Sequence, residues 1–134
     1  VQEWAEGKDI RISASDSMVR ALRKSRIAIQ TVPQTTYLET LSADHPTICF
    51  WNPEANMIRQ DLQPFYDGLI SVGVLHLSPE SAARQLNAVA ADPQAWWQSP
   101  PVRSALKAFR ENVCLTAPDA IEQWADFISE KIPA

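Results

Sequence analysis

The segment spanning residues 25–51 constrains the fold of this chain more than any other stretch. It begins with an apolar, β-branched run within Arg26–Thr31, which predicts a strand. A loop containing Pro33 follows, and Thr36–Ala43 has the pattern of a short amphipathic helix. The nearly unbroken apolar run Thr47–Trp51 is typical of a strand that is buried on both faces of a parallel sheet. The segment therefore predicts a strand–helix–strand unit of an α/β domain.

Two further strands are predicted outside this unit, at Asp9–Ser13 and at Val74–Leu77. The predicted helices run from Ser15 or Asp16 to Lys24 and over Thr36–Ala43, Glu54–Leu69 (interrupted at Pro64), Ser78–Ala91, Gln94–Gln98, Val102–Val113 and Asp119–Lys131. Strands that alternate with helices predict a parallel sheet with helices on both faces. We therefore expect one Rossmann-like domain over residues 1–134, a three-layer α/β/α arrangement with about four parallel strands. Residues 113–134 are expected to form a C-terminal helical extension.

Composition excludes several classes of protein. The chain has 134 residues, 46% of them hydrophobic, and a formal net charge of −4. This acidic balance argues against nonspecific binding to nucleic acid or to an anionic membrane, which requires a basic surface. No apolar run reaches the roughly 20 residues of a membrane span, so we expect no transmembrane segment. Cys49 and Cys114 are far apart and have no metal-ligand spacing, so two free thiols and no metal site are expected.

Polar residues collect where the first strand of the central unit meets its helix. Gln34, Thr35 and Thr36 lie at this junction, and Glu39 follows one turn inside the helix. In parallel sheets ligands bind at the carboxyl ends of strands, and a helix N-terminus favours anions through its free N–H groups and dipole. We therefore predict a phosphate contact at the two threonines and a sugar-hydroxyl contact at Glu39. The alternatives are plain N-capping by a threonine and a helix-dipole role for the glutamate.

Three other residues are predicted near the same edge of the sheet. Asn52 follows the strand that ends at Trp51, His76 ends the next strand, and Ser78 begins the following helix. Each side chain could contact a ligand there. Each also has a structural alternative: a turn asparagine, a half-buried structural histidine and an ordinary helix cap.

Several motifs resemble the carboxyl-terminal part of a bacterial family of transferases in surface-carbohydrate (lipopolysaccharide or O-antigen) biosynthesis. The resemblance covers roughly residues 9 to 113 and rests on the runs SRIAIQT, TTYLETL, HPTICFWNP, PFYDGLISVGVLH, SPESAA and DPQAWW. That family is in turn similar to two-domain GT-B glycosyltransferases. The resemblance implies the donor-binding half of a GT-B fold, with a nucleotide sugar bound by this domain and a carbohydrate acceptor bound with the help of an N-terminal domain that this chain lacks.

The resemblance also implies chemistry and location. It points to glycosyl transfer from a nucleotide sugar, with a CMP-Kdo-type donor among the possibilities, and to no metal or other cofactor. It implies a cytoplasmic location, including the inner face of the bacterial inner membrane. No catalytic residue of this chain is implied, and without its N-terminal domain the chain is expected to be inactive. One departure from the family pattern is clear, because Pro33 and Gln34 stand where a glycine normally precedes the helix.

Two other classes remain open on the sequence. A non-catalytic Rossmann-like module would bind a nucleotide or dock another domain, and a flavodoxin-like or receiver-like domain would act in signalling. The receiver-like alternative is weakened because Ser13, Ala14 and Ser15 precede a single acidic residue, Asp16, where an acidic cluster would be expected. Affinity for a nucleotide sugar separates a donor-binding domain from the other two.

Overall fold

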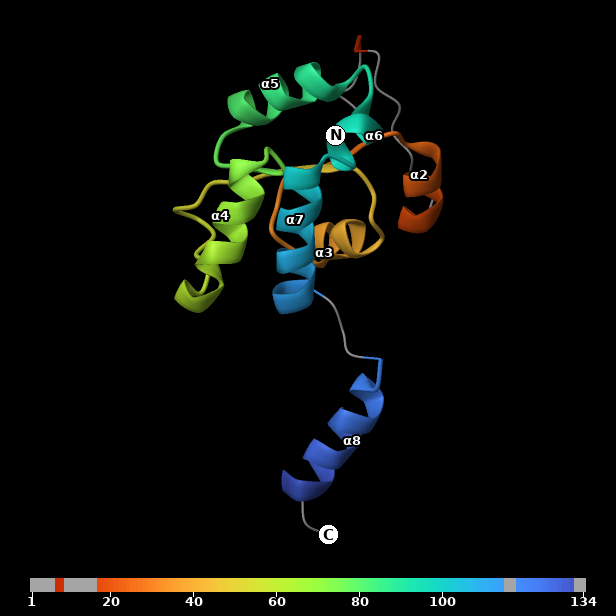
Figure 1. Ribbon diagram of the computed structural model, residues 1–134, viewed down its shortest axis with the longest axis vertical. Coiled ribbons are helices and arrows are strands. Elements are labelled where there is room, and N and C mark those ends of the chain that lie inside the picture. Colours follow the sequence, from red (N-terminus) through yellow and green to blue (C-terminus); the bar gives the residue numbers. More distant parts are fainter. Residues whose placement is uncertain (1–6, 9–16, 115–117, 132–134) are drawn as a thin grey trace.

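The computed structural model describes residues 7–8, 17–114 and 118–131 and contains a parallel three-stranded sheet (Figure 1). The strands are β1 (Ala28–Gln30), β2 (Thr47–Phe50) and β3 (Leu75–His76), in the spatial order β1–β2–β3. Both pairs are parallel, with Ala28 opposite Thr47 and Cys49 opposite Leu75. The predicted α/β class and parallel sheet are confirmed. The predicted strand at Asp9–Ser13 lies outside the described residues.

Helices lie before, between and after the strands in the sequence. They are α2 (Met18–Lys24), α3 (Thr35–Ser42), the 3₁₀ turn η1 (Gln60–Leu62), α4 (Gln63–Ser71), α5 (Pro79–Val89), α6 (Pro93–Trp97), α7 (Pro100–Phe109), the π-helical turn η2 (Arg110–Cys114) and α8 (Ala120–Lys131). Proline occupies the first turn of α4, α5, α6 and α7. Backbone N–H groups in the first turn have no partner within the helix, so proline's lack of an N–H costs no hydrogen bond there.

Alternate residues of β2 face two different layers of helices. Cys49 belongs to a core with α3, α4 and α7, whereas Ile48 packs with Ala82 and Val89 of α5. Successive side chains of a strand point to opposite faces of the sheet, so helices cover both faces of β2. In Figure 1, α5 lies above α3, α4 and α7, in agreement with these two layers.

The main core is built on aromatic rings and aliphatic side chains. Phe109 of α7 is fully buried and lies edge-on to Tyr66 of α4, with 5.1 Å between the ring centroids. Trp97 is also fully buried, and its neighbour Trp96 is partly buried and donates its Nε1 to the Val72 carbonyl at 3.2 Å. The expectation that at least one of these adjacent tryptophans belongs to the core is confirmed.

The predicted helix Glu54–Leu69 is wrong in its first half. Asn52 accepts a hydrogen bond on its Oδ1 from the backbone N–H of Glu54 at 2.9 Å, which makes a local turn. The α-helix α4 starts only at Gln63, and Pro64 lies in its first turn instead of interrupting it. The segment before it runs as turns and irregular backbone, so polar side chains follow β2 where a helix was expected.

Smaller differences concern helix ends. Ser17, and not Ser15 or Asp16, caps α2 by accepting from the backbone N–H of Arg20, and α3 begins one residue earlier than predicted. Helix α4 ends at Ser71, two residues beyond the predicted end, and is followed by Gly73, whose φ of +74° suits a residue without Cβ. A Cβ added there would lie 2.8 Å from the flexible end of the Gln85 side chain, so the positive φ is the main reason for a glycine at this position.

Helix α8 stands apart from the body formed by the other described elements (Figure 1). Its large apolar side chains are exposed: 82% for Ile121, 64% for Trp124, 53% for Phe127 and 48% for Ile128. The predicted helix at Asp119–Lys131 is confirmed. Its role as an extension to the domain stays a prediction.

The two thiols differ in their surroundings, and we expect them to differ in reactivity. Cys49 is 1% exposed in β2, and burial raises the pKa of its thiol to about 12, whereas Cys114 is partly exposed at the end of η2. Because the thiolate is the reactive form, a thiol reagent at pH 8 should label Cys114 rapidly and Cys49 only after unfolding. Labelling followed by mass spectrometry, with Cys114→Ser as the control, measures this. Comparable rates for both thiols would contradict the packing of β2.

Candidate functional site

A cavity of about 270 Å³ lies at the carboxyl edge of the sheet. Its lining comes from the loop after β1, the first turn of α3, the irregular segment after β2 and the start of α4: Pro33, Tyr37, Asn56, Met57, Ile58, Arg59, Leu62 and Tyr66. The cavity thus occupies the position where parallel sheets bind ligands. It exists because residues after β2 form an irregular wall and not the helix that the sequence predicts.

Two tyrosines form the inner wall of this carboxyl-edge cavity. The hydroxyl groups of Tyr37 and Tyr66 are hydrogen-bonded at 2.7 Å. Burial, followed by this hydrogen bond, raises the pKa of Tyr37 well above its ordinary value, so its hydroxyl stays protonated at neutral pH. Trp51 lies edge-on to both rings, at 5.5 and 6.2 Å, and its buried Nε1 has no hydrogen-bond partner among the described residues.

The outer wall carries the charged and amide groups. Arg59 donates Nε and Nη2 to the two carboxylate oxygens of Asp61, each at 2.6 Å, in a well-exposed ion pair. Asn56 donates its amide to the backbone carbonyl of Asn52 at 3.0 Å. An exposed pair of this kind contributes little stability, so Arg59 can exchange its partner for a ligand anion at low cost.

The structure brings three of the predicted residues beside this cavity. Gln34, Thr35 and Thr36 are exposed and lie between two lining residues, Pro33 and Tyr37. Gln34 is the N-cap of α3, and no side chain caps the helix, so the alternative of a capping threonine is wrong. The first turn of α3 therefore has no side-chain cap, and its two threonines are exposed, an arrangement that favours an anion.

Glu39 lies away from the carboxyl-edge cavity. It is exposed and lines a second cavity of about 500 Å³ between α2 and α3, together with Met18, Arg23 and His45. Residues two positions apart in a helix are separated by about 200° around its axis. Glu39 therefore points away from Tyr37 and from the carboxyl-edge cavity. The structure therefore places Glu39 away from the carboxyl-edge cavity.

Asn52, His76 and Ser78 have local structural partners. Asn52 forms the turn described above, and Ser78 caps α5 by accepting from the Ser81 N–H at 3.2 Å. His76 Nε2 lies 3.0 Å from the Gly73 carbonyl, so Nε2 donates and Nδ1 accepts from the Ser81 hydroxyl at 3.1 Å. Burial lowers the pKa of His76. These contacts agree with the structural alternatives, and none of the three residues lines the carboxyl-edge cavity.

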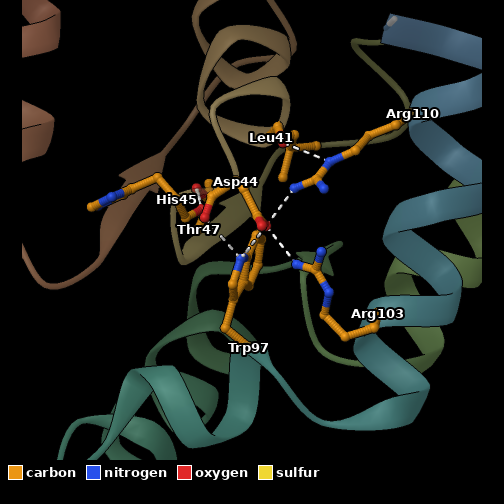
Figure 2. A network of polar contacts seen from close by, with 7 residues as sticks. All are labelled: Leu41, Asp44, His45, Thr47, Trp97, Arg103 and Arg110. Carbon is orange, nitrogen blue, oxygen red and sulfur yellow. Dashed lines mark hydrogen bonds and ion pairs between the residues drawn. The ribbon is translucent and has the colours of Figure 1, made fainter.

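A second polar network lies at the opposite, amino end of β2 (Figure 2). Oδ1 of Asp44 accepts from Trp97 Nε1 at 2.9 Å, Arg103 Nη1 at 2.5 Å and Arg110 Nη2 at 2.6 Å. Arg110 also donates Nε to the Leu41 carbonyl at 2.8 Å. Burial alone would raise the pKa of Asp44, but these hydrogen bonds lower it to about 2. The network ties the α3–β2 loop to α6 and α7, and the sequence did not predict it.

Two other properties bear on function. Among residues 7–8, 17–114 and 118–131, no three His, Cys, Asp or Glu side chains gather where they could hold a metal ion. No helix within the same ranges is long and apolar enough to cross a membrane.

Comparison with known proteins identifies the family. The model of the LIC12162 family transferase matches residues 2–128 of this chain. No curated protein and no solved structure matches it. Because the family match spans nearly all of the 134 residues, the chain belongs to the LIC12162 family of transferases.

Proposed function

We propose that this domain binds the nucleotide-sugar donor of a glycosyltransferase in bacterial surface-polysaccharide biosynthesis. The observation that carries the proposal is the carboxyl-edge cavity, which joins polar and aromatic groups at the sheet edge where Rossmann-like domains bind nucleotides. Membership in a transferase family supplies the reaction class. The finer reading, a GT-B donor half with a CMP-Kdo-type substrate, rests on the resemblance of the sequence motifs.

The residues at the cavity suit a nucleoside phosphate. In this proposal the N–H groups at the start of α3, with Thr35 and Thr36, bind a phosphate oxygen, and Arg59 of the cavity lining supplies a positive charge. Pro33 and Ile58 offer apolar surface for a base or sugar ring, and Asn56 offers an amide. In this arrangement the domain stabilises negative charge on the departing phosphate. Glu39 takes no part, because it lines the other cavity.

The whole enzyme is proposed to be larger than this domain. A second, N-terminal domain would supply the catalytic base and the carbohydrate acceptor site. It would work at the cytoplasmic face of the inner membrane, where donor nucleotides are available. We assign no catalytic residue to this chain, and no metal or cofactor besides the nucleotide-sugar substrate.

A second candidate function has one observation in its favour. The apolar face of α8 is exposed, and large exposed apolar surfaces mark sites of interaction with other proteins. A non-catalytic module that docks another domain through α8 would fit this face. Such a docking module should bind no nucleotide, whereas a regulatory module should bind one without regard to its sugar.

A binding titration with CMP, UDP and GDP, and with the corresponding nucleotide sugars, tests the proposal. We expect saturable binding of one nucleotide and tighter binding of its sugar conjugate. Arg59→Gln should weaken this binding about tenfold, as expected when a charged hydrogen-bond donor is removed. Calorimetry or NMR shift perturbation supplies the affinities.

Glu39→Ala is the matched control, since it removes a charge from the second cavity. Loss of binding in Arg59→Gln with no change in Glu39→Ala supports the carboxyl-edge cavity. The opposite result would place the ligand between α2 and α3. If no nucleotide binds to this domain, and none binds to a chain that includes the N-terminal domain, the donor-site proposal is overturned.

A further inference from the structure

Three cationic side chains line one side of α7 and η2. Arg103, Lys107 and Arg110, spaced by four and then three residues, lie on the same helical face, and together with Glu111 they line a cavity of about 320 Å³. The chain as a whole carries a net charge of −4. A concentration of positive charge in an acidic protein is a feature that the donor-site proposal does not use.

Internal carboxylates neutralise these cations only in part. Arg103 and Arg110 approach the same oxygen of Asp44 (Figure 2), so two positive charges share one negative charge. Lys107 pairs with Glu111 at 3.2 Å. The three cations and two carboxylates leave a local charge of +1 at the cavity, with guanidinium groups that still have unused N–H donors within the part of the chain that the structure describes.

The two arginines are held in place before any ligand arrives. The Arg110 side chain is only 13% exposed and is fixed at both Nε and Nη2, by Leu41 and Asp44. Lys107 and Glu111 are different, because their side chains are 75% and 51% exposed. Such an exposed i,i+4 pair is weak, so Lys107 can turn toward an incoming anion while Glu111 competes with that anion for it.

We propose that this cavity binds a phosphoryl group. Guanidinium groups match the tetrahedral oxygens of phosphate with paired hydrogen bonds, and an ammonium group adds a mobile positive charge. The site is distinct from the donor cavity, because Asp44 precedes β2 whereas Asn56 and Arg59 follow it. A phosphate monoester could reach it either as a soluble molecule or as a lipid headgroup, and the chemistry of recognition is the same.

The test is the stabilisation of the 134-residue chain by phosphate and pyrophosphate, with chloride at equal ionic strength as the reference. Ligand affinity follows from the shift of thermal unfolding with ligand concentration. Lys107→Gln should weaken binding about two- to fivefold, and Glu111→Gln should strengthen it by a similar factor, the range for one exposed charge pair. Lys131→Gln, which removes the same charge on α8, should change nothing.

Opposite shifts in Lys107→Gln and Glu111→Gln, with no shift in Lys131→Gln, support the site. Equal weakening of phosphate binding by every variant that removes a positive charge would overturn the site, since that result indicates only nonspecific electrostatic attraction of the anion. No stabilisation beyond that of chloride would also overturn it. Vesicles of phosphatidylcholine with and without phosphatidic acid then separate the two sources, because only a headgroup site should retain the chain on acidic vesicles in a Lys107-dependent manner.

Discussion

Replacing Phe109 by alanine is expected to lower the free energy of unfolding by about 3–5 kcal/mol, the usual cost of truncating a buried phenylalanine. The ring is fully buried and contacts two other aromatic rings, with centroids 5.1 Å from Tyr66 and 6.4 Å from Tyr37. Its removal leaves a cavity against the tyrosine pair that walls the carboxyl-edge site. Urea unfolding followed by tryptophan fluorescence measures the loss.

Phe109→Leu is the matched control, because it keeps an apolar side chain at the position. It should cost clearly less than the alanine variant, since part of the packed volume is retained. If both variants lost less than about 1 kcal/mol, a value typical of partly exposed sites, α7 would not pack against α3 and α4 as described. The nucleotide titration applied to Phe109→Leu would show whether the tyrosine wall tolerates a change behind it.

The parallel sheet could be predicted because its signals are local. β2 is a mostly apolar run buried on three successive residues, Thr47, Ile48 and Cys49, and that pattern is typical of a strand covered on both faces. The helix caps are equally local, as Ser78 and the proline after it show. Hydrophobic periodicity fixes such elements without knowledge of the tertiary structure.

The candidate site could be predicted only in part. The position of Thr35 and Thr36 at the carboxyl edge follows from the order of strand and helix. The tyrosine wall could not be predicted, because the hydrogen bond between Tyr37 and Tyr66 joins residues 29 positions apart. In the sequence, both tyrosines occupy apolar positions of their helices, which indicates a place in the core and not in a site. The irregular backbone of the outer wall was not predicted for another reason, since a local turn at Asn52 overrode the helical pattern of the following residues.

The separation of Glu39 from the carboxyl-edge cavity is a matter of helix geometry. On a helix the residues three or four apart share a face, so Glu39 shares a face with Thr35 or Thr36 but not with Tyr37. The structure places the cavity on the Tyr37 side, where α4 and the segment after β2 converge. Which face of α3 carries the site depends on that long-range packing, and the sequence of the helix alone does not contain it.

Replacing Asp44 is expected to have the second largest effect on stability. Asp44→Asn removes the negative charge that two guanidinium groups share and leaves the mostly buried Arg110 without its anion. Loss of a buried ionic partner costs about 1–3 kcal/mol, and the 41% exposure of the Asp44 side chain places the expected loss at the lower end of that range. Urea unfolding at pH 7 measures it.

Backbone conformation and pH separate the causes of that loss. Asp44 has a φ of +56°, a region open to Asn, Asp and Gly, so Asp44→Ala should cost about 1 kcal/mol more than Asp44→Gly.

The pKa of Asp44 is lowered from 3.8 to about 2 by its hydrogen bonds, although burial opposes them. A carboxylate with a lowered pKa stabilises the folded state above its unfolded pKa and ceases to do so as the pH falls through its folded pKa. The stability difference between the natural chain and Asp44→Asn should therefore be constant above about pH 5 and shrink between about pH 4 and pH 2. A difference that stays unchanged over this range would mean that the charge of Asp44 does not hold the α3–β2 loop to α7.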